Sequence, residues 1–489
     1  MHRTLDCRRA GFLNNGDRFA RPQSNHQKDV RKPYSEGHES ILSGPVRPVR
    51  DSGAVHFPWA FALPGSRAGK GHRRALGLYF RGMTFLEIAF APYAVQSKVI
   101  PSMAFNFDSC PERAGTDSTK WHKYVQRDII PSWIADMDFT SPPAVVEALQ
   151  ARAAHGVYGY PAQRDEVFNS VVKYMRRRHG WEIQPEWITF MTSLVPGIHG
   201  AIRCTTNPGE TVVTSTPAYP PFLTAPIISE RSSIKLEMVL VDGYWTFDWE
   251  KLEAACSQSA SKILLLCNPY NPLARVFSRA ELERIATIVK KYNLTVCSDE
   301  IHCDLILDPA AKHIVFAAID EDTKARTVTL MAASKTYNIA GLTCGFAIIA
   351  DAGLRTKFRR ILQGLSLDQN VFGLAATQAA FDHGEEWRVA CIEYLRGNLD
   401  LIEKELKQMP GVVLHQRPQS SFLAWLDISA LGFENAHAEF EKGGVGLSNG
   451  LDFGGLSHVR INFGCPRARL QEMLNRMKAV VARAPSNKK

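Results

Sequence analysis

Asn271, Asp299 and Lys335 each stand at or just after the carboxyl end of a short apolar segment. The three segments are residues 262–267, 294–299 and 326–333. They are rich in β-branched residues and do not alternate with polar ones, which predicts strands buried on both faces of a sheet. The carboxyl ends of parallel strands meet at one edge of a sheet, so the three polar side chains are expected to face one crevice.

These three residue types together match the needs of pyridoxal phosphate. Burying an ammonium group is costly, so Lys335 either reaches water or takes part in chemistry. A lysine with a lowered pKa can form a Schiff base with the cofactor. Asp299 would keep the pyridine nitrogen protonated, and Asn271 would hydrogen-bond the ring hydroxyl oxygen. The simpler interpretations are a solvated lysine at the start of a helix, a helix cap and a turn residue.

The elements around these residues alternate between strand and helix. Further buried strands are predicted over residues 211–215 and 344–350. A helix is predicted within 278–292, where Ser278 is a good N-cap and Glu281 completes a capping box. This order predicts an α/β fold with a mostly parallel central sheet that binds its ligand at the strands' carboxyl ends.

The pattern changes near residue 385. Residues 385–409 are predicted to form one long amphipathic helix, and residues 420–428 and 458–464 are predicted to form alternating strands. A smaller α+β C-terminal domain is therefore expected. The predicted division is an extension over 1–103, an N-terminal segment of the small domain over 104–150, a large cofactor-binding domain over 151–384, and a C-terminal small domain over 385–489.

The charge of the chain is unevenly distributed. Of 58 Lys and Arg and 49 Asp and Glu, residues 1–100 hold 16 and 7, so the remaining residues hold 42 of each. The neutral body argues against a nucleic-acid partner. The basic, aperiodic extension is predicted to be disordered and without a role in catalysis, with Met103 as a plausible true start; a targeting segment is the alternative.

The cysteines predict the compartment. Ten cysteines are scattered without a CxxC pair or zinc-ligand spacing, so no metal site is expected and a reduced, cytoplasmic location fits best. No run approaches 18 apolar residues, so no membrane span or membrane partner is expected.

Several motifs then point to one family. The order Asn271, Asp299, Lys335 resembles the fold-type-I pyridoxal-phosphate enzymes, and "SKTYNIAGL" (334–342) resembles the class I/II aminotransferase signature. "WIADMDF" (133–139) resembles one branch, the cystathionine β-lyase-like carbon–sulfur lyases. The motifs "GVYGYP", "SDEIHCDL", "FLAWLD" and "RINFGCPR" resemble the same branch. Because independent segments agree in the right order over about residues 104–480, the combined signal is strong.

The resemblance assigns further roles by position. Tyr219 would stack on the pyridine ring, and Arg460 would clamp the α-carboxylate of an amino-acid substrate. Tyr160 would reach the phosphate of the neighbouring subunit, which implies a homodimer with shared active sites. The phosphate would be held by the backbone N–H groups of Ser193, Leu194 and Val195 at a helix N-terminus, with Pro196 at the first helical position and Ser334 adding a hydroxyl.

The sequence departs from the family pattern at four positions. Tyr270 and Ala274 replace a usual His and Gly, Ala333 stands where many relatives carry Pro, and Thr343 stands where many transaminases carry a phosphate-binding Arg. Tyr270, Ala274 and Ala333 put loop details and substrate fit in doubt. The last leaves less positive charge near the phosphate, which also occurs in the lyase branch.

The resemblance implies a carbon–sulfur β-lyase. Lys335 would remove the α-proton of cystathionine or another cysteine S-conjugate, and loss of a thiol would lead to pyruvate and ammonia. An aminotransferase on the same scaffold is the main alternative, and it would need a 2-oxo acid acceptor. A non-catalytic protein that keeps the fold is the third interpretation, although Lys335 and Asp299 are both present.

Overall fold

The computed structural model describes residues 105–366 and 368–485. The predicted extension over 1–103 lies outside the described residues. All described residues belong to one compact unit.

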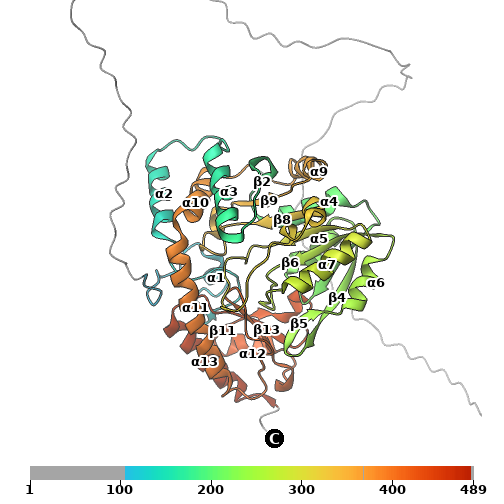
Figure 1. Cartoon of the computed structure of the whole chain (residues 1–489). Helices are drawn as coiled ribbons and strands as arrows, with labels where there is room; N and C mark the ends of the chain where they lie inside the picture. The colour runs from blue at the N-terminus through green and yellow to red at the C-terminus, as the bar shows by residue number, and fades with distance from the viewer. Residues whose placement is uncertain (1–104, 367, 486–489) are drawn as a thin grey trace, which may run out of the picture. The chain divides into compact units, whose positions relative to one another are not determined.

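The centre of the molecule is an eight-stranded mixed sheet in the order β2-β9-β8-β7-β6-β3-β4-β5 (Figure 1). Strands β8, β7, β6, β3 and β4 run parallel to one another, whereas β9, β2 and β5 pair antiparallel with their neighbours. The sheet is thus mostly parallel, as predicted. Its strands are β2 (Ile188–Met191), β3 (Thr211–Thr216), β4 (Ser232–Val241), β5 (Tyr244–Phe247), β6 (Ser261–Cys267), β7 (Thr295–Asp299), β8 (Thr327–Met331) and β9 (Gly345–Ile348).

The inner strands are buried along nearly their whole length, as their apolar sequences predicted. Every residue of β8 and β9 is buried, and β6 and β7 each have one less buried residue. The sheet is flanked by helices, and α4 packs on several of its central strands. The flanking helices are α4 (Leu194–Thr205), α5 (Pro220–Ile228), α6 (Trp249–Cys256), α7 (Arg279–Lys291), α8 (Glu321–Arg326) and α9 (Ala352–Leu362).

Helix α7 confirms the predicted capping box. The Ser278 side chain accepts a hydrogen bond from the Glu281 backbone, and the Glu281 side chain accepts one from the Ser278 backbone. Helix α7 therefore starts where the sequence indicated, and it connects β6 to β7 in the way that a parallel strand pair requires.

A smaller C-terminal domain carries the three-stranded antiparallel sheet β10-β13-β12, formed by Leu423–Asp427, His458–Asn462 and Ser448–Asn449. Strand β1 (Ile130–Pro131), from far earlier in the chain, pairs with β11 (Val445–Gly446). The long helix α11 (Glu385–Leu406) is confirmed, and in Figure 1 it lies beside α13 (Arg467–Val481).

The alternating pattern predicted for β10 and β13 is wrong. Four of the five residues in each strand are buried, because both faces of this sheet are covered. Val459 and Ile461 belong to the same hydrophobic core as Leu470 of α13. Arg460 points the other way and lies over the ring of Phe453.

The remaining helices are α1 (Thr119–His122), α2 (Pro143–Ala154), α3 (Asp165–His179), α10 (Val371–His383) and α12 (Ala436–Lys442). Helix α10 packs against both α2 and α3. The expected boundary after residue 150 falls inside α2, and the one after residue 384 falls between α10 and α11.

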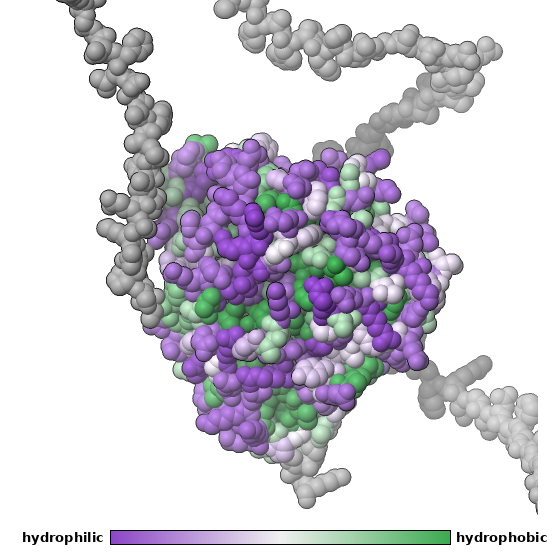
Figure 2. All heavy atoms as spheres, in the orientation of Figure 1, coloured by the Kyte–Doolittle hydropathy of each residue, from purple (hydrophilic) through white to green (hydrophobic). Residues whose placement is uncertain are grey.

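The face of the molecule in Figure 2 is mainly hydrophilic, with hydrophobic residues gathered near its centre. Among the described residues, no helix is long and apolar enough to cross a membrane. The nine cysteines in this part of the chain are all free thiols.

Candidate active site

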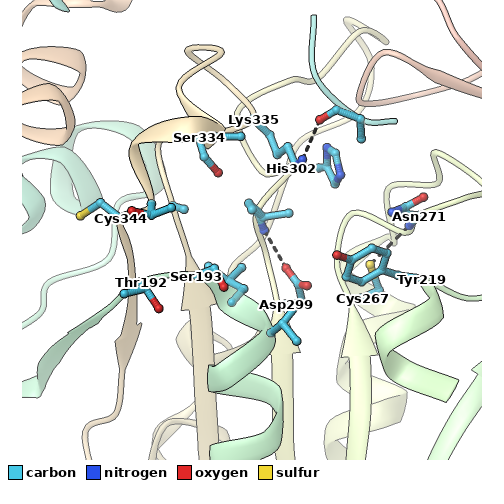
Figure 3. Close-up of a pocket in the computed structure, with 17 residues that line it drawn as sticks. Thr192, Ser193, Tyr219, Cys267, Asn271, Asp299, His302, Ser334, Lys335 and Cys344 are labelled. Atoms are coloured by element: carbon cyan, nitrogen blue, oxygen red, sulfur yellow. Dashed lines mark hydrogen bonds between the residues drawn. The ribbon is translucent and has the colours of Figure 1, made fainter. Parts of the chain in front are cut away.

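A cavity opens at the carboxyl ends of β6, β7 and β8, next to the N-terminus of α4 (Figure 3). It contains eight of the ten residues predicted for the site. The residues that line it are Ala135, Thr192, Ser193, Leu194, Val195, Tyr219, Cys267, Asn271, Asp299, Ile301, His302, Ala332, Ser334, Lys335, Ala340, Thr343 and Cys344.

Asp299 is the last residue of β7 and is only 4% exposed. Its Oδ1 accepts a hydrogen bond from the backbone N–H of Ile301 at 3.2 Å. Burial raises the pKa of Asp299 to about 7, against the lowering effects of the Ile301 hydrogen bond and the Lys335 charge. The carboxylate would therefore be stabilised by a further positive charge in the cavity.

Lys335 lies in the turn that follows β8, with its amine inside the cavity (Figure 3). Its Nζ donates a hydrogen bond to the carbonyl oxygen of Ala135 at 2.6 Å. Burial lowers the pKa of Lys335 to about 8, while the charges of Asp136 and Asp299 oppose this shift and Arg460 adds to it. About a tenth of the amine is therefore neutral at pH 7, far more than for a lysine with its ordinary pKa, and a nucleophile or a base requires this neutral form.

Asn271 connects the cavity to Arg460. The Asn271 backbone N–H contacts Cys267 Sγ at 3.3 Å, and its Oδ1 accepts a hydrogen bond from Arg460 Nη1 at 2.9 Å. Arg460 Nη2 donates to the carbonyl of Trp133 at 2.8 Å and to Ser448 Oγ at 3.2 Å. Arg460 does not line the cavity itself; it lies directly behind Asn271. Burial lowers the pKa of Arg460 to about 10, so the guanidinium still carries its charge at neutral pH.

The predicted phosphate site is at the N-terminus of α4. Ser193 is the N-cap residue, and Leu194 and Val195 begin the first turn. The N–H groups of a first helical turn have no acceptor within the helix, and the helix dipole favours an anion there. Pro196 was predicted to be the first helical residue, but it is the third, because the helix begins two residues earlier. Proline lacks an N–H group, but a residue in the first turn of a helix makes no N–H hydrogen bond within the helix, so none is lost.

The two predicted tyrosines lie in different places. Tyr219 precedes α5 and lines the cavity opposite Asp299, where a flat ring could contact its aromatic face (Figure 3). Burial raises the pKa of Tyr219, and the Asp299 charge acts in the same direction. Tyr160, by contrast, is 99% exposed and does not line this cavity within its own chain. Its predicted role in a neighbouring subunit stays a prediction.

Sequence reasoning missed several cavity residues. His302 lines the cavity beside Lys335, and its Nδ1 lies 3.1 Å from Ser421 Oγ. Burial lowers the pKa of His302 to about 3, so the imidazole is neutral. Its place three residues after Asp299 was a usable signal. Ala135, Cys267 and Cys344 offered none, because Ala135 contributes its backbone carbonyl and small apolar residues are common in cores.

Two of the departures from the family pattern have structural consequences. Ala274 has a φ of +53°, a left-handed conformation that glycine adopts without strain. Thr343 also has a positive φ, lines the cavity, and accepts a hydrogen bond from Asn370 Nδ2 at 2.9 Å. Tyr270 is buried away from the cavity, where its hydroxyl lies 2.7 Å from Ser215 Oγ.

These groups fit pyridoxal phosphate. Asp299 is a buried carboxylate that a protonated ring nitrogen would neutralise, and Lys335 is an amine with a lowered pKa on the same rim. The free N–H groups of α4 suit a phosphate, and Tyr219 suits the face of an aromatic ring. Each of these groups would match one part of the bound cofactor in its chemistry.

Comparisons with known proteins agree with this fit. Residues 134–477 match the family of class I and II aminotransferases. The chain is 38% identical to the cystathionine beta-lyase PatB of Bacillus subtilis (strain 168), covering 77% of this chain and 100% of that protein. Crystal structures of OvoB (41% identity, TM-score 0.75) and of Treponema denticola cystalysin, which contains pyridoxal 5'-phosphate (33% identity, TM-score 0.74), are similar. They cover 78% and 77% of this chain, and 100% and 99% of their own. The chain therefore belongs to the class I and II aminotransferase family of fold-type-I pyridoxal-phosphate enzymes, in its cystathionine β-lyase-like branch.

Proposed function

We propose that this protein is a pyridoxal-phosphate-dependent carbon–sulfur β-lyase that acts on cystathionine or another cysteine S-conjugate. The observation that carries the proposal is the placement of the Lys335 amine and the Asp299 carboxylate in one cavity, with Ala135 of the lyase-like "WIADMDF" motif in contact with Lys335. The similarity to PatB over its full length supports elimination as the reaction.

The chain's own residues bind and orient the substrate. Arg460 would bind the α-carboxylate through its Nε, which is buried without a hydrogen-bond partner among the described residues, and through Nη1. The guanidinium is held by Asn271, Ser448 and the carbonyl of Trp133, so its position is fixed before a substrate arrives. A charge-assisted contact of this kind selects amino acids with a free α-carboxylate.

Lys335 would then act as the base. Its side chain would first hold the cofactor covalently, and the substrate amine would replace it. The freed amine, kept partly neutral by burial, would take the α-proton of the substrate. When bound, the cofactor supplies an electron sink for the carbon that loses this proton. The Asp299 carboxylate would hold the ring nitrogen in its protonated form.

The products follow from the atoms involved. The C–S bond breaks, the sulfur leaves with the bonding electrons and gains a proton, and the remaining three-carbon enamine takes up water. One cysteine S-conjugate and one water thus give one thiol, one pyruvate and one ammonium ion. No acceptor is consumed, whereas an aminotransferase would need a 2-oxo acid to complete its cycle.

We also propose features of the whole protein that rest on the sequence. The division into an N-terminal extension, a large cofactor-binding domain over 151–384 and a small domain built from 104–150 and 385–489 is one. A homodimer, in which Tyr160 contacts the partner's phosphate site, is another, and the high exposure of Tyr160 is compatible with it. A cytoplasmic location is the third, supported by the free thiols of the described residues.

A substrate panel tests the proposed function. Purified enzyme is incubated with cystathionine, cystine and S-alkyl cysteines without added 2-oxo acid, and pyruvate and free thiol are measured. We expect both products from at least one member of the panel, and none from the Lys335→Ala enzyme. Products that form only after a 2-oxo acid is added would show an aminotransferase instead.

A further inference from the structure

The backbone of residues 132–139 touches both active-site cations. The carbonyl of Trp133 accepts a hydrogen bond from Arg460 Nη2 at 2.8 Å, and the carbonyl of Ala135 accepts one from Lys335 Nζ at 2.6 Å. In Figure 3 this segment approaches the cavity from outside the central sheet, and the dashed line to Lys335 marks the second contact. Two carbonyls only two residues apart thus face the two groups that handle the substrate.

Two asparagines hold this segment in place. The Nδ2 of Asn338 donates to the carbonyls of Met137 and Phe139 at 3.0 and 2.7 Å, and its Oδ1 accepts the N–H of Met137 at 2.9 Å. The Nδ2 of Asn462 donates to the carbonyls of Ile134 and Asp136 at 2.6 and 2.7 Å. Asn338 is three residues after Lys335, and Asn462 is two residues after Arg460. Asn338 thus links the turn that carries Lys335 to the segment, and Asn462 links the strand that carries Arg460 to it.

A buried ionic cluster also holds this segment. Asp138 is 2% exposed, and its carboxylate contacts Lys120 at 3.1 Å, Arg113 at 2.8 Å and Arg469 at 3.1 Å. Lys120 Nζ also donates to the carbonyl of Asp136 at 3.2 Å. A buried carboxylate with three cationic partners is costly to rearrange, so the path of the backbone around Ala135 is fixed.

We propose that the Ala135 carbonyl positions the freed amine of Lys335 during proton transfer, and that Asn338 is a positioning residue that places this carbonyl. A neutral primary amine has two N–H donors and one lone pair. When one N–H is donated to Ala135, the amine can no longer turn freely, and its lone pair points to a defined side. The carbonyl thereby aligns the base with the α-proton, without touching the substrate.

The inference rests on the proposed function only as far as α-proton removal, which elimination and transamination share. Alanine has an α-proton but no β-leaving group, so its exchange in D₂O measures this step alone. The loss of the Cα–H signal is followed by NMR with the holoenzyme. In the apoenzyme, methylation of Lys335 by formaldehyde and cyanoborohydride is measured by peptide mass as a second readout.

The test variant is Asn338→Gly, because Asn338 has a φ of +56° and glycine keeps that backbone conformation. The matched control is Asn398→Ala. Asn398 is a buried asparagine that, like Asn338, donates to two backbone carbonyls; here they are those of Phe463 and Cys465, both at 2.9 Å. Both variants lose comparable hydrogen bonds, but only Asn338→Gly removes the hydrogen bonds to the backbone of residues 137–139.

For Asn338→Gly we expect α-proton exchange to fall about 10²-fold, the factor for a catalytic group misplaced by about 1 Å. The concentration of alanine at half-maximal rate should change little, because Arg460 keeps its contacts. Methylation of Lys335 in the apoenzyme should rise about two- to tenfold, the factor for one lost hydrogen bond. Asn398→Ala should match the wild type in both readouts.

Equal exchange rates in the two variants, or unchanged methylation in Asn338→Gly, would overturn the inference. Asn462→Ala is measured in parallel, because it releases the carbonyls of Ile134 and Asp136 on either side of Ala135. Asn462→Ala should also lower α-proton exchange and raise the methylation of Lys335. If Asn338→Gly does not fold, the result for Asn462→Ala supports or overturns the inference. If the protein proves to be an aminotransferase, alanine exchange still tests the role of Ala135. Failure of the proposed lyase function can therefore be distinguished from failure of the inference about Ala135.

Discussion

The cavity has two walls that differ in how well the chain satisfies its own polar groups. The cofactor wall, formed by Asp299, Lys335, Tyr219 and the N-terminus of α4, holds charges whose pKa values burial shifts strongly. The arginine wall is Asn271, which lines the cavity, together with Arg460, Ser448 and the Trp133 carbonyl, which do not line it; its guanidinium already has three hydrogen bonds. The ionisable groups of the cofactor wall would be neutralised by a bound cofactor. The guanidinium of the arginine wall is held by hydrogen bonds before the substrate binds.

This difference predicts how the two walls respond to substitution. Groups on the cofactor wall should control whether the cofactor is attached and whether the α-proton is removed. The arginine wall should control how tightly the amino acid binds, with the spectrum of the bound cofactor unchanged. A substitution in one wall that changed both α-proton removal and amino-acid binding would contradict this division of roles.

The largest effect is expected for Lys335→Ala, which removes the attachment point and the base together. Elimination should fall about 10⁴-fold or more, the upper range for general acid–base catalysis. Pyruvate release measures the rate, and peptide mass after borohydride reduction should show the cofactor on Lys335 in the wild type alone. Lys291→Ala, at a lysine paired with Glu253 far from the cavity, serves as the control and should retain full activity. A reducible linkage that survives in Lys335→Ala would disprove the assignment.

Asp299→Ala should act later in the reaction. The cofactor should still attach to Lys335, but α-proton exchange should fall about 10³-fold because the buried charge that stabilises the developing electron density is lost. Asp304→Asn is a suitable control, since Asp304 is equally buried and its pKa is also raised to about 7. An Asp299→Ala enzyme that exchanges the α-proton at the control's rate would remove Asp299 from the cofactor wall.

Arg460→Leu should have a smaller effect. Loss of a charge-assisted contact that leaves its partner unpaired costs about 2 kcal/mol at the lower end of the observed range, or roughly 30-fold. The lower end is expected because the substrate shares the guanidinium with Asn271 and Ser448. Steady-state kinetics should show a rise in KM for every amino-acid substrate, with cofactor absorbance intact. A loss of cofactor absorbance would place Arg460 on the cofactor wall instead.

The rate of cofactor attachment to the apoenzyme should depend on pH through Lys335. Only the neutral amine attacks the cofactor aldehyde, and the pKa of Lys335 is lowered from 10.5 to about 8. The rate should therefore rise about tenfold per pH unit below pH 8 and level off above it. Stopped-flow absorbance measures the rate. Because the Asp136 charge raises this pKa, Asp136→Asn should move the midpoint to lower pH. A rate that still climbs at pH 10 would contradict the lowered pKa.

The smallest effect concerns the loop that follows Asn271. Ala274 has a positive φ at the position where the family usually carries glycine. Ala274→Gly should stabilise the protein by about 1 kcal/mol, because the left-handed conformation strains any residue with a Cβ. Urea denaturation measures the change, and the catalytic constants should stay the same. A destabilised variant would mean that the methyl group's packing outweighs the backbone strain.

The cofactor wall was largely predictable from the sequence, because each of its residues follows a buried strand or begins a helix. Those positions can be found from local patterns such as the segments ending at Asp299 and before Lys335. The contacts of the arginine wall were not predictable. One of them joins Arg460 in β13 to Trp133, which lies more than 300 positions away, and it uses a backbone carbonyl that any residue type can supply. The burial of both faces of β10 and β13 was missed for the same reason, since it depends on what packs against the sheet.

The most direct test of the proposed β-elimination is the product ratio in the absence of an amino-group acceptor. The enzyme is incubated with cystathionine or the best cysteine S-conjugate, and thiol, pyruvate and ammonia are measured over many turnovers. β-Elimination predicts equal amounts of all three, with continued turnover and no dependence on added 2-oxo acid. Product formation that stops after one equivalent per site and resumes only when a 2-oxo acid is supplied would contradict it.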